Sequence, residues 1–435
     1  MTHRHPRPFL SLTLACVGAL AVAALPDLRA ASAEWPGWRG PARDAVSPET
    51  GLASNWGESG PPLAWKASGM GAGFSSLAVV DGRIYTMGDR DGAQFLLALD
   101  ASNGSLVWNA RVGPVWSDEY GGPRGTPTVD GGSVYALGTE GDLVAVEAAT
   151  GGERWRRKLS SDFGGQVMSM WKWSESPLVD GDRVVVTPGA RGAALVALDK
   201  ATGREIWRAA VPELGPAGRD GAAYSSIVIS NAGGVKHYVQ LLGRGLVGVR
   251  ASDGQFLWGY NRVANQVANI STPLVRANWA FASTGYQTGA ALVELQKGGD
   301  GLQARELYFL GAKTFQNHHG GMVLVGNHVY GGNGQSKGFP TCIEFTTGKL
   351  AWGGDIRNAG TGSAAVAYAD GHLYFRYQNG VVVLIQATPE SYREKGSFTI
   401  PDVVKPSWSH PVIQGGRLYL REQDMLYAYN VRKAG

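Results

Sequence analysis

Short apolar strands alternate with tight turns along this chain, and the same order of elements returns eight times. In the first unit an apolar strand at residues 75–80 is followed by an Asp-Gly turn, then by strands at 83–87, 95–99 and 106–112. Asp-Gly, Asn-Gly and Gly-Gly pairs supply the positive φ angles that two-residue hairpin turns need. No stretch has the period of a long amphipathic helix. The pattern predicts an all-β chain of repeated four-stranded units.

A Trp lies four residues after a Gly in the last strand of most units. The positions that mark the repeat are Trp65, Trp108, Trp155, Trp207, Trp258, Tyr308, Trp352 and Phe398. They lie 43 to 52 residues apart, which suits four-stranded blades. Such a unit cannot bury its apolar face alone and must stack on its neighbours. We therefore expect the six Trp residues of this set to be structural residues that pack between blades.

The number of first strands is eight, but the last unit, residues 411–429, lacks its fourth strand. Residues 63–66, Leu-Ala-Trp-Lys, precede the first full unit and can supply that strand. A ring closed in this way has no open sheet edges. The sequence predicts an eight-bladed β-propeller of four-stranded antiparallel blades, closed by an N-terminal strand that pairs with the last blade. Seven blades is the alternative count.

Residues 1–33 have the features of a secretory signal peptide. A basic start precedes an uncharged run of 17 residues and the small-residue site Ala-Ser-Ala at 31–33, which predicts cleavage and export. An uncleaved anchor is the alternative, because about 20 such residues span a bilayer. We expect residues 34–62 to form a lead, either a flexible approach or a plug under the ring, and residues 63–432 to form the propeller. The protein is then periplasmic or secreted, with no transmembrane span after cleavage.

Composition agrees with this fold and excludes several chemistries. The 435 residues include 63 Gly and 14 Trp but only 17% charged residues, as expected of a turn-rich β protein. A formal net charge of +4 provides no basic field for nucleic acid. Cys342 is the only cysteine after the signal, so an internal disulfide and a Cys-x-x-Cys-His haem site are excluded from the mature chain. Motifs for nucleotide binding and for a nucleophilic serine are absent.

The repeat resembles that of the pyrroloquinoline-quinone (PQQ) repeat propellers, the quinoprotein alcohol dehydrogenase-like family. The Gly-x-x-x-Trp strand ends, the Ala-Leu-Asp and Val-Glu-Ala third strands and the eightfold count carry the resemblance over residues 63–429. The opening Trp-Pro-Gly-Trp-Arg-Gly-Pro at 35–41 is similar to a secreted bacterial subgroup. The resemblance implies either a non-catalytic propeller or a quinoprotein dehydrogenase. The chain lacks the two adjacent Cys that many alcohol-oxidising members carry over the cofactor.

The segments that enter each first strand meet at one mouth of a propeller's channel, and we expect a site there. A quinone tricarboxylate needs aromatic faces, cations, a metal such as calcium and a carboxylate base. The residues in these segments that match this need are the cofactor-binding candidates Arg124, Trp171, Trp173, Arg219, Tyr224, Asn269 and Trp408, the calcium ligands Glu175 and Asn269, and the catalytic candidates Glu175 and Asp220.

Structural roles are the alternative for the same residues. Arg124 and Glu175 can neutralise each other across adjacent blades, and the two tryptophans at 171 and 173 can shield the top of the core. His318 and His319 point to opposite sides of an extended segment, so these two alone do not form a metal site.

We expect a binding or scaffold module that takes a protein, a glycan or a small molecule at the channel mouth. A periplasmic dehydrogenase that uses PQQ and calcium to oxidise an alcohol or polymeric alcohol is the alternative. Neither haem nor a nucleotide cofactor is expected.

Overall fold

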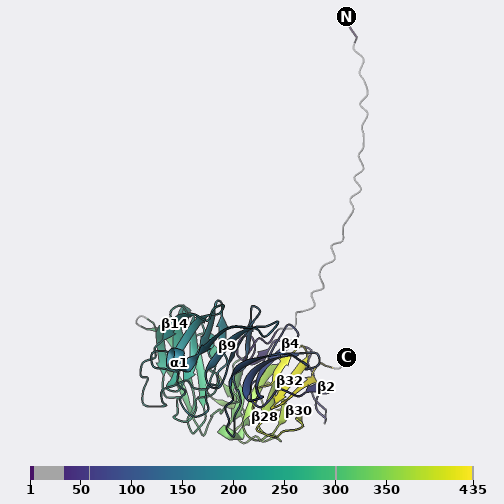
Figure 1. The fold of residues 1–435 in the computed structure, drawn as a ribbon. Coiled ribbons are helices and arrows are strands. Elements are labelled where there is room, and N and C mark those ends of the chain that lie inside the picture. The colour runs from purple at the N-terminus through teal and green to yellow at the C-terminus, as the bar shows by residue number, and fades with distance from the viewer. Residues whose placement is uncertain (4–33, 58, 299–300, 434–435) are drawn as a thin grey trace. The chain divides into compact units, whose positions relative to one another are not determined.

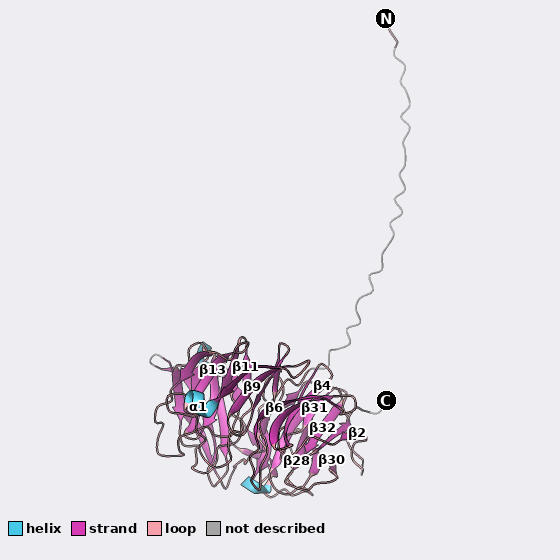
Figure 2. Cartoon of the chain, viewed as in Figure 1, coloured by secondary structure: helices cyan, strands magenta, loops and turns pink. Residues whose placement is uncertain are grey.

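The computed structural model describes residues 1–3, 34–57, 59–298 and 301–433. Residues 4–33, which hold most of the predicted signal peptide, lie outside the described residues. The chain divides into two units, Met1–Ser32 and Ala33–Gly435. Within the described part, no helix is long and apolar enough to cross a membrane. Strands joined by loops make up the described ribbon of the second unit, with very little helix (Figure 2).

The described residues of the second unit form eight sheets, each with four antiparallel strands. One sheet has a fifth, parallel strand, and the last sheet takes one of its four strands from the N-terminal part of the unit. The first four blades contain β3 (Ala78–Val80), β4 (Arg83–Arg90), β5 (Ala93–Asp100), β6 (Leu106–Pro114); β7 (Thr128–Asp130), β8 (Ser133–Leu137), β9 (Asp142–Glu147), β10 (Glu153–Lys158); β11 (Leu178–Asp180), β12 (Arg183–Val186), β13 (Leu195–Asp199), β14 (Glu205–Ala209); and β15 (Val228–Ser230), β16 (His237–Leu242), β17 (Gly245–Arg250), β18 (Phe256–Tyr260).

The last four blades contain β19 (Leu274–Arg276), β20 (Trp279–Thr284), β21 (Gly289–Gly298), β22 (Gly301–Gly311); β23 (Met322–Val325), β24 (His328–Asn333), β25 (Phe339–Glu344), β26 (Leu350–Trp352); β27 (Ala364–Ala369), β28 (His372–Tyr377), β29 (Val381–Gln386), β30 (Glu394–Thr399); and β31 (Val412–Gln414), β32 (Arg417–Glu422), β33 (Met425–Asn430) with β2. The helices of the described residues are short: α1 (Leu159–Phe163) and the 3-10 turns η1 (Ala232–Gly234) and η2 (Gln335–Lys337).

The ring is closed by the N-terminal strand β2 (Leu63–Ala67). It pairs antiparallel with β33, so that Leu63 faces Tyr429 and Lys66 faces Tyr427. Figure 1 shows purple β2 beside the yellow C-terminal strands. The prediction of an eight-bladed propeller closed by the segment 63–66 is confirmed.

The hydrophobic core lies between neighbouring blades. One cluster joins Leu96 and Trp108 of blade 1 to Val134 and Val144 of blade 2, all at most 9% exposed. Similar clusters join the other blades around the ring. Each blade therefore buries its apolar faces against its neighbours, as a repeat architecture requires.

The Gly-to-Trp repeat joins each blade to the next one. Trp207 Nε1 of blade 3 donates a hydrogen bond to the carbonyl oxygen of Ala251 in blade 4 at 3.2 Å, and its ring packs on Gly254 of the same turn. A β-bulge just before Trp207 turns the ring toward blade 4. The same contacts recur at Trp108 and Trp155. The Gly of one repeat therefore receives the Trp of the preceding repeat.

The variant Gly254→Ala should lose more stability than Gly92→Ala. Both glycines have a φ of 77°, so each Ala carries a similar backbone strain of about 1 kcal/mol. A Cβ at Gly92 meets nothing within 4 Å, whereas a Cβ at Gly254 lies 2.6 Å from the Trp207 ring. We expect Gly254→Ala to lose about 2 kcal/mol more free energy of unfolding, measured by urea denaturation. Equal losses would contradict a structural role for the Trp–Gly contact.

The lead segment lies across the axis of the ring. Its residues 35–47 make hydrogen bonds to the first strands of seven blades, or to the residues just before those strands. The groups contacted belong to Val79, Val129, Pro177, Thr272, Met322, Tyr368 and Ile413, and β1 (Val46–Ser47) pairs in parallel with β27. Because the inner strands of a propeller surround its axis, a segment bonded to seven of them is a plug and not a flexible approach.

The plug has an unusual backbone that its side-chain contacts stabilise. Arg39, Arg43 and Ala45 have φ angles of 61°, 57° and 62°, which cost about 1 kcal/mol each in residues other than glycine. Both arginines are buried, and Arg43 donates hydrogen bonds to the carbonyl oxygens of Ser176 and Pro177 at 2.8 and 3.0 Å. These contacts hold the plug in place on blade 3.

Candidate functional site

A cavity of about 340 Å³ lies on the axis, where the loops between blades meet the plug. Trp38 of the plug and residues from all eight blades line it. The lining residues are Trp38, Phe74, Tyr120, Arg124, Trp171, Ser174, Tyr224, Ser226, Ile270, Ser271, Thr272, Tyr286, His318, His319, Gly321, Ser336, Gln378, Trp408 and His410. We call this space the axial cavity. Since the plug contacts the inner strands beyond these loops, Trp38 closes the inner end of the cavity.

Seven Trp, Tyr and Phe side chains from the described part of the chain line the cavity. The Trp408 ring lies 4.9 Å from Phe74 and 5.1 Å from Tyr120, measured between ring centroids. On another part of the wall, Trp171 stacks with Tyr286 at 6.5 Å and an interplanar angle of 28°. Such rings offer apolar faces against which a flat ligand can pack. The predicted residues Arg124, Trp171, Tyr224 and Trp408 all belong to this lining.

Arg124 is the one cation among the lining residues that the structure describes. Its guanidinium donates hydrogen bonds to two backbone carbonyl oxygens, those of Tyr120 at 2.5 Å and Trp171 at 3.3 Å, and lies 4.6 Å from the Trp116 ring centroid. Burial lowers the pKa of Arg124 to about 10, so the group stays charged at neutral pH. It forms none of the ion pairs within the described part of the chain, and the alternative of a pair with Glu175 is not observed.

Three imidazoles surround one side of the cavity. Burial lowers the pKa of His318 to about 4 and that of His410 to about 3, and it also holds the pKa of His319 well below its usual value. His318 is bonded to Ser363 and Tyr286 at 2.8 and 3.1 Å. His319 Nε2 and His410 Nδ1 are buried without a hydrogen-bond partner. The imidazoles are therefore neutral at pH 7, and the two nitrogens without a partner are buried beneath the cavity surface.

Three other predicted site residues are buried outside the axial cavity. Glu175 is 2% exposed and accepts hydrogen bonds from the backbone and hydroxyl of Thr187. Burial raises the pKa of Glu175 to about 7, although the Thr187 bonds and the charge of Arg43 lower it. Trp173 is in the core and donates to the carbonyl oxygen of Thr187 at 3.2 Å. Asn269 bonds to the carbonyl oxygens of residues 242 and 243, both at 3.0 Å. These residues have structural contacts, and their predicted roles in binding or catalysis stay predictions.

Asp220 and Arg219 also lie outside the lining. Asp220 forms ion pairs with Arg244 at 2.6 Å and Arg191 at 2.8 Å. The hydrogen bonds from these arginines, that from Arg244 first, lower the pKa of the carboxyl. Arg219 is exposed. The structure therefore brings together four of the predicted cofactor-binding residues, Arg124, Trp171, Tyr224 and Trp408. It places the other candidates outside the lining: Trp173, Arg219, Asn269, Glu175 and Asp220.

Several lining residues were not identified from the sequence. Trp38, Phe74, Tyr286 and Gln378 belong to the wall, and Gln378 Oε1 accepts a hydrogen bond from Trp408 Nε1 at 3.0 Å. The aromatic-rich run Trp-Pro-Gly-Trp in the lead could have identified Trp38 as a lining residue. That inference requires knowing that the lead reaches the axis of the ring, which the sequence does not show. Tyr286 has a φ of 55°, a backbone strain that the sequence does not reveal.

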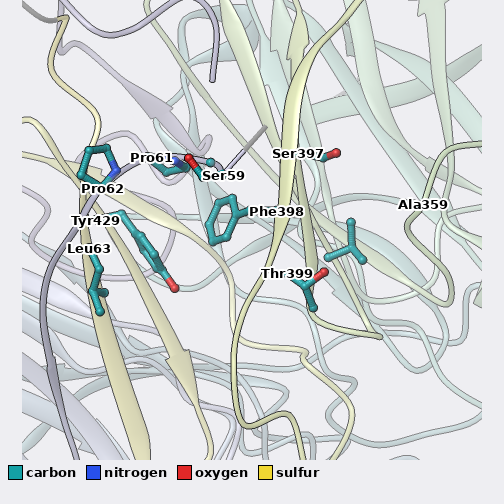
Figure 3. Close-up of a pocket in the computed structure, with 11 residues that line it drawn as sticks. Ser59, Pro61, Pro62, Leu63, Ala359, Ser397, Phe398, Thr399 and Tyr429 are labelled. Atoms are coloured by element: carbon teal, nitrogen blue, oxygen red, sulfur yellow. The ribbon is translucent and has the colours of Figure 1, made fainter. Parts of the chain in front are cut away.

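A second, larger hollow lies at the outer edge of the ring. It has a volume of about 740 Å³ and lies where residues 59–63 pass β30 of blade 7. Figure 3 shows Phe398, Tyr429 and Thr399 on its wall. Its lining contains no carboxylate, imidazole or amine among the described residues. Because it lacks these groups, we take the smaller axial cavity as the candidate site.

A metal centre is not apparent in the described part of the chain. No group of three or more His, Cys, Asp or Glu residues there is arranged to hold a metal ion. None of the described residues that line the axial cavity is Asp or Glu. The donors that calcium prefers are carboxylate and carbonyl oxygens, so the cavity lining does not fit a calcium ion.

Comparison with known proteins relates the chain to two groups of propellers. Outer membrane protein assembly factor BamB of Burkholderia pseudomallei is 27% identical over 204 residues, 44% of this chain and 43% of that protein; the match thus spans less than half of the curated relative. The crystal structure of BamB from Moraxella catarrhalis has a TM-score of 0.62 at 14% identity, covering 85% of this chain and 99% of that one.

The same fold occurs in quinohemoprotein alcohol dehydrogenase from Comamonas testosteroni, with a TM-score of 0.62 at 13% identity, covering 93% of this chain and 81% of that one. At these identities the solved structures establish the fold alone. The family model described as outer membrane protein assembly factor BamB matches residues 113–354, more than half of the chain. This protein therefore belongs to that family of PQQ-repeat β-propellers.

Proposed function

We propose that this protein is a binding module that works outside the cytoplasm and takes its ligand in the axial cavity without chemical turnover. The observation that supports the proposal most is the aromatic cavity on the ring axis, closed at its inner end by the plug. A concave, mostly apolar space of this size with a few polar groups is typical of a ligand site. The signal-peptide features of residues 1–33 support export, and the name of the BamB relatives supports a role in binding.

Exposed apolar side chains around the mouth extend the proposed binding surface. Met170, Val267 and Val404 are 64%, 40% and 78% exposed, and each lies in a loop that also carries a lining residue, Trp171, Ile270 or Trp408. Ser169 Oγ donates to the carbonyl oxygen of Val267 at 2.8 Å, so two of these loops are in contact. Exposed apolar groups gathered at a cavity mouth favour contact with a ligand or partner larger than the cavity.

The alternative, a PQQ- and calcium-dependent dehydrogenase, is supported by the fold and by part of the lining. Arg124 and the aromatic wall suit one carboxylate and the ring of a quinone cofactor. Such a cofactor would supply the oxidation of an alcohol. The lining residues described above include no carboxylate to hold calcium or to remove a proton from an alcohol, and Glu175 and Asp220 have other partners. We therefore rank this alternative second.

Binding in the cavity is tested with a neutral apolar dye, N-phenyl-1-naphthylamine, whose fluorescence rises in apolar surroundings. The variant Ser336→Trp places an indole in the lining at an exposed position of η2. We expect it to weaken dye binding to the full chain about tenfold through steric exclusion. Lys337→Trp is the matched control, because this neighbouring exposed residue does not line the cavity. Equal binding to both variants would contradict the proposed site.

Turnover is tested separately with PQQ, calcium, a panel of alcohols and an artificial electron acceptor. We expect no calcium-dependent dehydrogenase activity. Activity that appears only with both PQQ and calcium would overturn the binding-module proposal in favour of the dehydrogenase.

A further inference from the structure

We infer that the axial cavity binds a small ring compound carrying a single carboxylate, with the carboxylate on Arg124 and the ring against Trp171 and Trp408. The inference rests on the proposed function and names the ligand class of that site. Two sources share this chemistry, sugar acids and aromatic acids, and the test below distinguishes them.

The first argument is the state of Arg124. A buried guanidinium costs free energy unless its charge is compensated, yet its hydrogen bonds reach only the carbonyl oxygens of Tyr120 and Trp171. A guanidinium has five N–H donors and binds carboxylates through two parallel hydrogen bonds. Arg124 therefore retains donors beside the cavity and forms no ion pair among the described residues; the Asp118 and Asp89 carboxylates act on its charge without pairing with it. An anion in the cavity can accept hydrogen bonds from the remaining donors.

The second argument is the charge of the lining. Among the lining residues that the structure describes, Arg124 supplies one positive charge and no Asp or Glu supplies a negative one. Burial keeps His318, His319 and His410 neutral at pH 7. One carboxylate balances this charge. A tricarboxylate would bring two further negative charges into the cavity, whose described lining has no further cation. Removing those two carboxylates from water would cost free energy without a compensating ion pair.

The third argument is the remaining chemistry of the wall. The rings of Trp171 and Trp408 lie in separate aromatic groups of the lining, so a ring in the cavity meets apolar faces. Ser271, Thr272 and Gln378 also line the cavity, and their side chains carry hydroxyl or amide groups. A hydroxyl group on the ligand can donate to or accept from these side-chain groups. The combination suits a ring that carries hydroxyl groups as well as a carboxylate.

The test measures binding to the full chain by calorimetry and tryptophan fluorescence. The probes are glucuronate against glucose, and 4-hydroxybenzoate against 4-hydroxybenzyl alcohol. We expect at least one acid to bind about 10 to 100 times more tightly than its neutral counterpart, as a hydrogen-bonded charge pair predicts. The pair that shows the preference identifies the source as a sugar acid or an aromatic acid.

The variant Arg124→Gln should abolish the preference for the acid, whereas Arg219→Gln should keep it, because Arg219 is exposed and does not line the cavity. Two results would overturn the inference: equal binding of acids and neutral counterparts, or a preference that survives in Arg124→Gln. If the neutral dye binds and neither acid is preferred, the ligand class is wrong and the binding module stands. If neither the dye nor any acid binds, both proposals are wrong.

Discussion

Replacing Arg376 by Met should lower the free energy of unfolding by about 4 kcal/mol. Arg376 in β28 of blade 7 forms an ion pair with Glu422 of blade 8 at 2.7 Å, and the two side chains are 0% and 1% exposed. The guanidinium also donates to the carbonyl oxygens of Ser409 and Arg421. The Met variant leaves the Glu422 carboxylate buried without its cation. Urea denaturation followed by circular dichroism measures the loss.

Two further variants identify the cause of that loss. Arg208→Met breaks an ion pair whose side chains are 47% and 28% exposed, and such pairs contribute at most about 1 kcal/mol. In Arg376→Met/Glu422→Leu the uncompensated charge is absent, so we expect the double variant to recover at least half of the loss. A loss from Arg376→Met no larger than that from Arg208→Met would contradict the role of this pair in joining blades 7 and 8.

Acid should remove a stabilising contribution of His410. Burial holds its folded-state pKa at about 3, below the usual value of 6.5, and the nearby charges of Arg39 and Arg376 lower it further, while the His319 carbonyl raises it. Between pH 6.5 and pH 3 the unfolded chain therefore binds a proton that the folded chain does not. The contribution is present above pH 6.5 and is lost as the pH falls.

The comparison of wild type with His410→Gln isolates this effect. From pH 7 to pH 4, the stability of wild type relative to the variant should fall by about 3 kcal/mol. Between pH 8 and pH 7 the difference should be constant, which is the internal control. The comparison cancels the opposite contribution of Glu175, whose raised pKa of about 7 makes the folded state bind the extra proton. A difference that stays constant down to pH 4 would show that this imidazole titrates normally in the folded chain.

The axial site could be predicted only in part because the sequence reveals which loops meet but not where their side chains point. The loops before the first strands were the correct place to look, and Arg124, Trp171, Tyr224 and Trp408 line the cavity there. Glu175 lies in the same kind of segment, yet its carboxylate turns to Thr187. A change of one residue in an extended segment reverses the direction of the side chain, and the sequence does not determine that register.

The repeated order of strands and turns in the sequence predicted eight blades, with seven as the alternative, and the closure by residues 63–66. Those features depend on local turn residues and on a spacing that recurs in every unit. A strand that is unclear in one unit can therefore be located by comparison with the other units. Only the tertiary structure decided that the lead is a plug, that Trp38 reaches the cavity and that Arg124 forms no ion pair with any described residue. These facts depend on contacts between residues hundreds of positions apart, such as the 2.9 Å hydrogen bond from Trp38 to Thr272, and no local pattern in the chain encodes which of many such contacts forms.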